Sequence, residues 1–294
     1  MATVPHQPSQ PSQPSLIATV LREMRSSYAF IERNLFLTRR YWGWEVVWIV
    51  YSIVNAISIT FIAKAASSIT GEALSDAATS YFILYLLVGT VVWHYLSIVF
   101  DMTSEAIQWE RWEGTIEYTF MAPVSRTAHL LGQSLFAVLF GAVHTVIILT
   151  VLALMFQVDL SNANFATLAV ATLAGSLGFI GLGLVAAVLP LLWPEKGIQM
   201  TNIIKALILL VSGVYYPITV LPEWLQPIAY LSPATYMLDG MRRGLLDGAT
   251  PADLMVSHIL PLALTAVVAI PLGLYVFGRM EHYAKRTGIL KRNG

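Results

Sequence analysis

The sequence predicts an all-α integral membrane protein with six transmembrane helices. The chain has 294 residues, of which 56% are hydrophobic and 12% are charged, whereas a soluble domain carries about 25% charged residues. Six long apolar runs account for this composition, and each is long enough to cross the hydrocarbon core of a bilayer. Basic residues also gather on alternate connections between these runs, as in a polytopic membrane protein.

The overall charge and the absence of cysteine exclude several classes of protein. The 17 basic and 17 acidic residues give a net charge of zero, which argues against a globally basic protein that binds nucleic acid. Because the chain has no cysteine, it can form neither disulfides nor thiolate metal sites, and it has no cysteine nucleophile.

The N-terminal part is expected to lie outside the bilayer core. Residues 1–15 repeat Gln-Pro-Ser without charge, so we expect a disordered tail. Residues 16–41 alternate apolar and arginine positions at helical spacing. This pattern favours an amphipathic helix in the membrane interface over a solvated helix that leads into the first span.

The transmembrane domain is expected at 42–280 and is followed by a cytoplasmic tail at 281–294. Tryptophans at the start of the first span are typical of an interfacial aromatic belt, and the glycine-rich fourth span is typical of close helix packing. The six expected spans are 45–65, 80–101, 130–156, 164–192, 198–216 and 255–278.

The distribution of basic residues predicts the orientation of these spans. With the N-terminus inside, Lys64, Arg242 and Arg243 lie outside and Lys205 lies within a span, so the other 13 of the 17 basic residues face the cytoplasm. Positively charged connections remain in the cytoplasm. We therefore expect a multi-pass protein of the cell membrane with both termini cytoplasmic.

Two connections are unusual for simple loops. Stretch 102–129 is the most densely charged part of the chain, yet it also carries Trp109, Trp112 and Phe120. Gly114-Thr115 can break and restart a helix, so we expect a short helical hairpin with an exposed surface for a protein partner. Residues 217–247 are apolar but interrupted by proline, which favours half-inserted re-entrant helices on the outer side.

Both connections carry motifs of a known family. The first reads Glu-Arg-Trp-Glu-Gly-Thr-Ile-Glu at 110–117 and Ala-Pro-Val-Ser-Arg at 122–126, followed by Leu131-Gly132. The second reads Ser-Gly-Val-Tyr-Tyr-Pro at 212–217, Leu-Pro-Glu-Trp-Leu at 221–225 and Ser-Pro-Ala-Thr-Tyr at 232–236, with Arg242. The chain thus resembles type-2 ATP-binding-cassette (ABC) exporter permeases across nearly its whole length. Trp112 departs from the polar residue of many members.

The resemblance implies a transport subunit that performs no chemistry. Stretch 103–120 would be a coupling helix that docks on a separate ABC ATPase, and two permeases would work with two ATPases. No G-x-x-x-x-G-K-[ST] loop occurs in the sequence, so ATP and magnesium would bind the partner and this chain would need no cofactor. The candidate docking residues are Glu110, Arg111, Trp112, Glu113, Gly114, Thr115, Glu117 and Pro123.

The substrate path is expected along the second and fifth spans, which line the dimer axis in the family. Aromatic residues there fit an apolar or amphipathic substrate such as a drug, lipid or natural product, although they also suit a membrane-interface belt. A polysaccharide or glycolipid exporter of the same architecture is the alternative. The candidate path residues are Tyr81, Tyr85, Trp93, Lys205, Tyr215 and Tyr216.

Two other functional classes remain as alternatives. An intramembrane hydrolase would use Ser176 with a histidine such as His94, His144 or His258, but the small residues around Ser176 are explained by helix packing. A secondary transporter would need ionisable groups at mid-membrane, where Lys205 is the deep charge; it can reach the cytoplasm or face the path. We therefore predict no catalytic residue and no metal site.

Overall fold

The computed structural model describes residues 15–70, 76–156 and 161–290 and is all-helical over these ranges. Nearly all of the expected tail at 1–15 and the last residues of the expected tail at 281–294 lie outside them. The helices are α1 Leu16–Arg40, α2 Trp42–Thr70, α3 Asp76–Ser104, α4 Ala106–Glu113, α5 Ile116–Met121, α6 Arg126–Phe156, α7 Phe165–Ala186, α8 Val188–Leu192, α9 Gly197–Val211, η1 Ile218–Val220, α10 Gln226–Leu231, α11 Pro233–Leu246, η2 Met255–Ile259 and α12 Leu260–Thr287.

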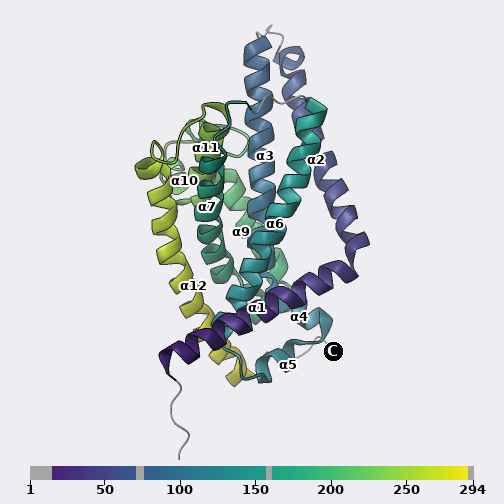
Figure 1. Ribbon diagram of the computed structural model, residues 1–294, viewed down its shortest axis with the longest axis vertical. Helices are drawn as coiled ribbons and strands as arrows, with labels where there is room; N and C mark the ends of the chain where they lie inside the picture. The colour runs from purple at the N-terminus through teal and green to yellow at the C-terminus, as the bar shows by residue number, and fades with distance from the viewer. Residues whose placement is uncertain (1–14, 71–75, 157–160, 291–294) are drawn as a thin grey trace, which may run out of the picture.

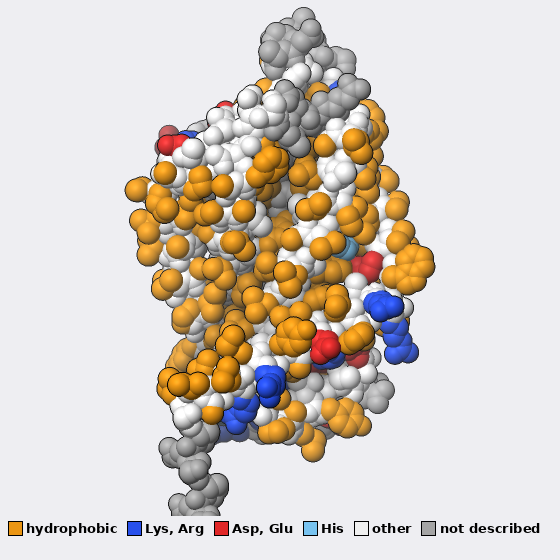
Figure 2. All heavy atoms as spheres, in the orientation of Figure 1, with side chains coloured by type: hydrophobic (Ala, Val, Ile, Leu, Met, Phe, Trp, Pro, Cys, Tyr) orange, Lys and Arg blue, Asp and Glu red, His pale blue; other side chains and the backbone are white. Residues whose placement is uncertain are grey.

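Five helical segments of the described chain are long and apolar enough to cross a membrane. A band of hydrophobic side chains covers the middle of the molecule, whereas most charged side chains lie toward its two ends (Figure 2). The chain is therefore an integral membrane protein. The segments are Trp42–Ala65, Ala78–Ser104, Arg126–Phe156, Phe165–Leu192 and Met255–Thr287.

The expected fifth span is shorter than the sequence suggested. We expected a helix over 198–216, but α9 ends at Val211 after 15 residues, which is about 22 Å of helix. Gly213 then adopts a positive φ of 68°, a conformation that favours glycine and ends the helix. The prediction of six full spans therefore remains a prediction.

Two groups of helices lie at opposite ends of the bundle (Figure 1). The amphipathic α1 lies across the base, near α4 and α5, while α10 and α11 lie at the other end. We call these the hairpin end and the outer-helix end. At the hairpin end α12 continues to Thr287, so part of the segment expected as a tail is helical.

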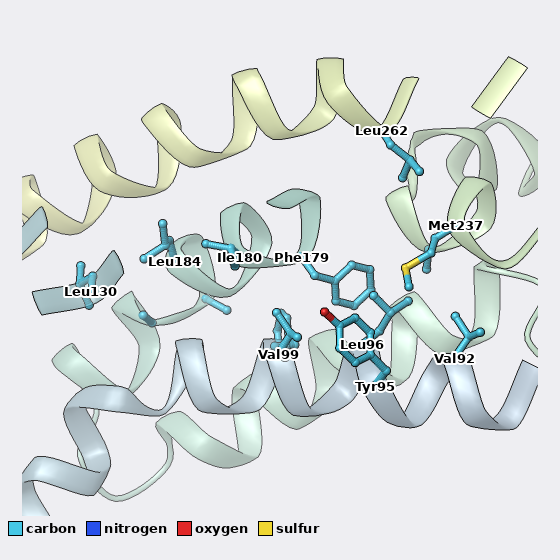
Figure 3. Close-up of a cluster of buried hydrophobic side chains, with 14 of the residues drawn as sticks. Val92, Tyr95, Leu96, Val99, Leu130, Phe179, Ile180, Leu184, Met237 and Leu262 are labelled. Atoms are coloured by element: carbon cyan, nitrogen blue, oxygen red, sulfur yellow. The ribbon is translucent and has the colours of Figure 1, made fainter. Parts of the chain in front are cut away.

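The core is built mainly from α3, α7, α11 and α12. Phe179 of α7 lies beside Tyr95 and Leu96 of α3, with Met237 of α11 close by (Figure 3). A glycine brings α7 and α12 into close contact, because a Cβ added at Gly181 would lie 2.4 Å from that of Ala269. Small residues thus allow backbone approach here, as the glycine-rich sequence predicted.

Candidate docking and transport site

The charged stretch forms the expected helical hairpin. Helix α4 ends at Glu113, and Gly114 follows with a φ of 72°, which suits glycine at a helix C-terminus. Helix α5 begins at Ile116 and ends at Met121, after which Ala122 is extended. The residue before a proline disfavours helical backbone, so Pro123 accounts for this second stop. The predicted break at 114–115 is confirmed.

Arg111 fastens the hairpin to the end of the fourth span. Its side chain is 1% exposed, and its two terminal nitrogens donate to the carbonyl oxygens of Pro190 and Leu191, at 2.5 and 2.9 Å. The last carbonyls of a helix lack partners within the helix and carry partial negative charge. The guanidinium satisfies two of these groups at once, so α4 is held rigidly against α8.

Glu110 fastens the hairpin to two further helices. Its Oε1 lies 3.0 Å from Nη1 of Arg33 in α1 and 3.0 Å from Nε2 of His129 in α6, and it accepts a bond from Thr119 of α5. Burial raises the pKa of Glu110, but its contacts with His129 and Arg33 outweigh burial and hold this pKa below its usual value. Glu110 is therefore an ionised anchor inside the chain.

Helix α5 is joined to the C-terminal helix. Arg126 donates to the carbonyl oxygen of Thr119 at 2.8 Å and to Glu281 of α12 at 3.2 Å. The Arg126 guanidinium also lies 4.0 Å from the ring centroid of Phe120, which Lys285 approaches at 5.8 Å. The hairpin thus contacts α1, α6, α8 and α12.

The candidate docking residues divide into two groups. Glu110 and Arg111 are buried, so the expectation that the whole charged stretch is exposed is wrong at these two positions. Trp112, Glu113, Glu117 and Pro123 are exposed, and Gly114 and Thr115 form the half-buried turn between the helices. The docking role of the eight residues remains a prediction.

Two aromatic residues enlarge the exposed face of the hairpin. Trp109 and Trp112 are 48% and 53% exposed, and their rings meet edge to face with centroids 5.0 Å apart. Tyr118 and Met121 of α5 are 78% and 84% exposed. Exposed aromatic and methionine side chains of this kind are enriched at protein interfaces. Tyr118 and Met121 were not among the predicted docking residues.

The candidate path residues lie at different depths. Tyr81 and Tyr85 have ring centroids 6.4 Å apart on α3, whereas Lys205 pairs with Asp101, 16 residues farther along α3, or about 24 Å of helix. Trp93 packs edge to face on Phe179 of the core. Tyr215 packs against the core, and the Tyr216 hydroxyl donates to the carbonyl oxygen of Leu210. The path role of these six residues remains untested.

An ion pair joins the expected second and fifth spans. Nζ of Lys205 lies 2.7 and 2.6 Å from the two carboxylate oxygens of Asp101. The sequence placed Lys205 within a span but did not predict its partner, because the residues are 104 positions apart. The only signal was the presence of opposite charges near the inner halves of the two spans. Charged residues within membrane spans usually pair with one another, so Asp101 accounts for the charge of Lys205.

Arg242 organises the outer-helix end. Its guanidinium lies 3.5 Å from the ring centroid of Tyr85 and donates to the carbonyl oxygens of Gly213 and Val214, at 3.0 and 2.7 Å. These carbonyls follow the early end of α9, so Arg242 binds the backbone groups that the helix leaves free. The sequence motif included Arg242 but gave no indication of this contact.

The serine and the histidines considered for an intramembrane hydrolase contact other residues rather than one another as a Ser–His pair. The Ser176 hydroxyl lies 2.5 Å from the hydroxyl of Tyr95 and donates to the carbonyl oxygen of Thr172. His94 and His144 stack with ring centroids 6.4 Å apart. His258 instead joins Asp239 at 2.6 Å and Ser257 at 2.7 Å. Ser176 thus bonds to a tyrosine and to backbone, as expected of a packing residue with a satisfied hydroxyl.

The helices and the buried network beneath the hairpin define a multi-pass helical membrane protein with a rigidly supported surface segment. Comparison with known families identifies this architecture. Residues 27–246 match the ABC-2 type transporter family, and the chain belongs to that family. It is accordingly an ABC transporter permease, a membrane subunit that is not itself catalytic. No curated protein matches the chain closely enough to refine this assignment.

Proposed function

We propose that the chain is the permease subunit of an ATP-driven exporter, in which two copies act with two separate ABC ATPase subunits. In this arrangement α9 completes six spans, and both termini, α1 and the α4–α5 hairpin face the cytoplasm. The hairpin is the coupling helix that receives movement from the ATPase. The excess of basic residues on these segments supports the orientation.

The observation that carries the proposal is the contrast between the two faces of the hairpin. Its inner face is fixed through Arg111 to α8 and through Glu110 to α1 and α6. Its outer face presents Trp112, Glu113 and Glu117. A segment that transmits movement needs a firm attachment to the bundle and a surface for a partner, and both occur within one short hairpin.

We further propose that the cargo is apolar or amphipathic, such as a drug, lipid or natural product, and that it crosses between the permeases by alternating access. Tyr81 and Tyr85 offer aromatic surface near the outer-helix end. The Asp101–Lys205 pair is partly exposed near the hairpin end, where it would present little net charge to an apolar cargo.

Co-purification with the ATPase tests this function. Glu113→Ala combined with Glu117→Ala removes two exposed charges and one of the two ion pairs of Arg33, while Glu110 keeps its contacts with Arg33, His129 and Thr119. We expect about tenfold weaker ATPase binding, because loss of important interface contacts costs about 1–2 kcal/mol. The matched control is Glu195→Ala combined with Glu223→Ala, which removes two charges from outside the hairpin. ATPase recovery that is equal for both double variants would contradict the docking role.

The energy source is tested separately in vesicles that contain permease and ATPase. Replacement of the catalytic glutamate of the ATPase should abolish export while leaving the complex assembled. Export that continues in this variant would contradict an ATP-driven mechanism, whatever the result for docking.

A further inference from the structure

A cavity of about 520 Å³ opens between α1, the start of α2, the end of α3, α4 and α6. Cavities of about 300–1,000 Å³ are typical of small-molecule sites. Figure 2 shows acidic and basic side chains beside hydrophobic ones in the region where α1, α2 and α4 converge. The cavity thus lies at the hairpin end, beside the apolar band that marks the bilayer.

Aromatic side chains form much of the cavity wall. Tyr41 and Trp44 come from the junction of α1 and α2, Trp109 and Trp112 from α4, and Phe136 from α6. The faces of aromatic rings carry partial negative charge and attract cations, with tryptophan the strongest of the three ring types. Such a wall favours an organic cation that also has apolar surface.

The charged side chains of the cavity wall also favour a cationic ligand. Among the residues that the structure describes, the lining contains three carboxylates, Glu45, Glu110 and Glu113, but one Lys or Arg side chain, that of Arg33. Arg33 is already engaged by Glu110 at 3.0 Å and Glu113 at 2.7 Å. Glu45 has His144 as its nearest basic group, at 3.7 Å. Among the described lining side chains the carboxylates thus outnumber the one guanidinium, which is already paired, although Arg40 lies 5.7 Å from the ring centroid of Tyr41 at the edge of the cavity.

One buried carboxylate oxygen adds a second indication of a ligand. Glu110 is fully buried, and its Oε1 takes the bonds from Arg33 and Thr119. Its Oε2 has no hydrogen-bond partner within the described chain. A buried carboxylate oxygen normally accepts hydrogen bonds, so this oxygen strengthens the negative potential of the cavity that Glu110 lines.

We propose that this cavity binds the amine or quaternary ammonium headgroup of an amphiphile in the inner leaflet. The aromatic wall surrounds the cationic head, Glu45 and Glu113 balance its charge, and the apolar tail extends into the bilayer beside α2. The site is separate from the candidate path residues but shares Trp112 and Glu113 with the candidate docking surface. The inference rests on the orientation proposed above and does not depend on ATP-driven export.

Binding of dodecyltrimethylammonium by the full-length chain in maltoside detergent tests the proposal. Isothermal titration should show binding at least about tenfold tighter than for dodecyl sulfate, which has the same tail and the opposite charge. Glu45→Gln and Trp44→Ala should each weaken binding about fivefold or more. Glu195→Gln and Trp193→Ala, which change exposed residues outside the cavity, are the matched controls and should bind as the unmodified chain does.

Two further arms identify the source of the headgroup and test the competing occupant. If the natural ligand is a lipid, dodecyltrimethylammonium should bind less well in nanodiscs of phosphatidylcholine than in nanodiscs of phosphatidylglycerol. Equal binding of the probe in both kinds of nanodisc indicates that the natural ligand is a cationic amphiphile other than the bulk lipid. Equal affinity for both dodecyl probes, or unchanged binding in Glu45→Gln and Trp44→Ala, would overturn the proposal. Loss of binding on addition of the ATPase would also overturn it, because the partner would then fill the cavity.

Discussion

The ammonium group of Lys205 lies 2.6 Å from Oδ2 of Asp101 and so joins α9 to α3. Removal of one partner leaves the other charge without compensation in a poorly hydrated place. Lys205→Met should therefore destabilise the protein more than Lys205→Met combined with Asp101→Leu. We expect a coupling energy of about 1–3 kcal/mol in a double-mutant cycle, measured by unfolding in detergent. Strictly additive effects would show that the pair adds nothing to stability.

Arg111 should not be replaceable by lysine. Lysine keeps the charge but lacks the planar fork that reaches the carbonyls of Pro190 and Leu191 together. Arg111→Lys should cost about 1–3 kcal/mol, because a buried carbonyl loses its partner. Limited proteolysis should then cut the α4–α5 hairpin faster. The control Arg22→Lys alters a mostly exposed side chain, and equal cleavage of both variants would contradict the anchoring role.

Contact between α7 and α12 should depend on Gly181. A methyl group there would lie 2.4 Å from Cβ of Ala269, so Gly181→Ala should destabilise the protein by about 1–3 kcal/mol. Gly278→Ala is the matched control on α12, since a Cβ at that position has no neighbour within 4 Å. Thermal unfolding in detergent should separate the two variants; similar unfolding temperatures would contradict close packing at Gly181.

Stability should fall as the pH rises toward neutrality because of Glu105. Burial first and the negative charge of Asp101 second raise the pKa of Glu105 from 4.5 to about 7, although Lys205 lowers it. The folded chain holds this proton up to about pH 7, whereas the unfolded chain releases it near pH 4.5. The stabilising effect is therefore complete below pH 4.5 and is lost as the pH rises to 7.

A variant isolates this contribution from those of other acids. After allowance for solvent screening, we expect Glu105 to account for about 1–2 kcal/mol of the decline. Glu105→Gln should remove that part of the pH dependence and raise stability at pH 8. Glu195→Gln should leave the slope unchanged; an unaltered slope in Glu105→Gln would show that the carboxyl is ionised throughout.

The sequence predicted those parts of the fold that depend on local chemistry. Apolar runs identified the long spans because the bilayer core accommodates apolar side chains. Gly114 marks the end of α4 because glycine readily adopts a positive φ, and Pro123 marks the end of α5 because proline restricts the residue before it. The apolar run at 198–216 misled the prediction at α9. Composition does not reveal that Arg242 binds the carbonyls of Gly213 and Val214 and supports an early helix end.

The site was less predictable because it depends on contacts between distant segments. Glu110 and Glu113 are both glutamates of the same charged helix. However, Glu110 contacts His129 inside the protein, whereas Glu113 lies at the surface. The pairing of Asp101 with Lys205 likewise depends on contact between segments that are distant in the sequence. Local pattern identifies a charged helix, but the packing of α1, α6 and α8 around it decides which charges remain available to a partner.

The ion pairs of Arg33 join α1 to the α4–α5 hairpin. Helix α1 lies along the base of the bundle (Figure 1) and exposes apolar side chains such as those of Leu16, Ile17 and Leu21. Its Arg33 forms ion pairs with both Glu110 and Glu113. If a thicker or more strongly charged bilayer displaced α1, α4 would move as well, because Arg33 joins the two helices. The composition of the leaflet that contacts α1 would then set the resting angle of the hairpin before any partner docks on it.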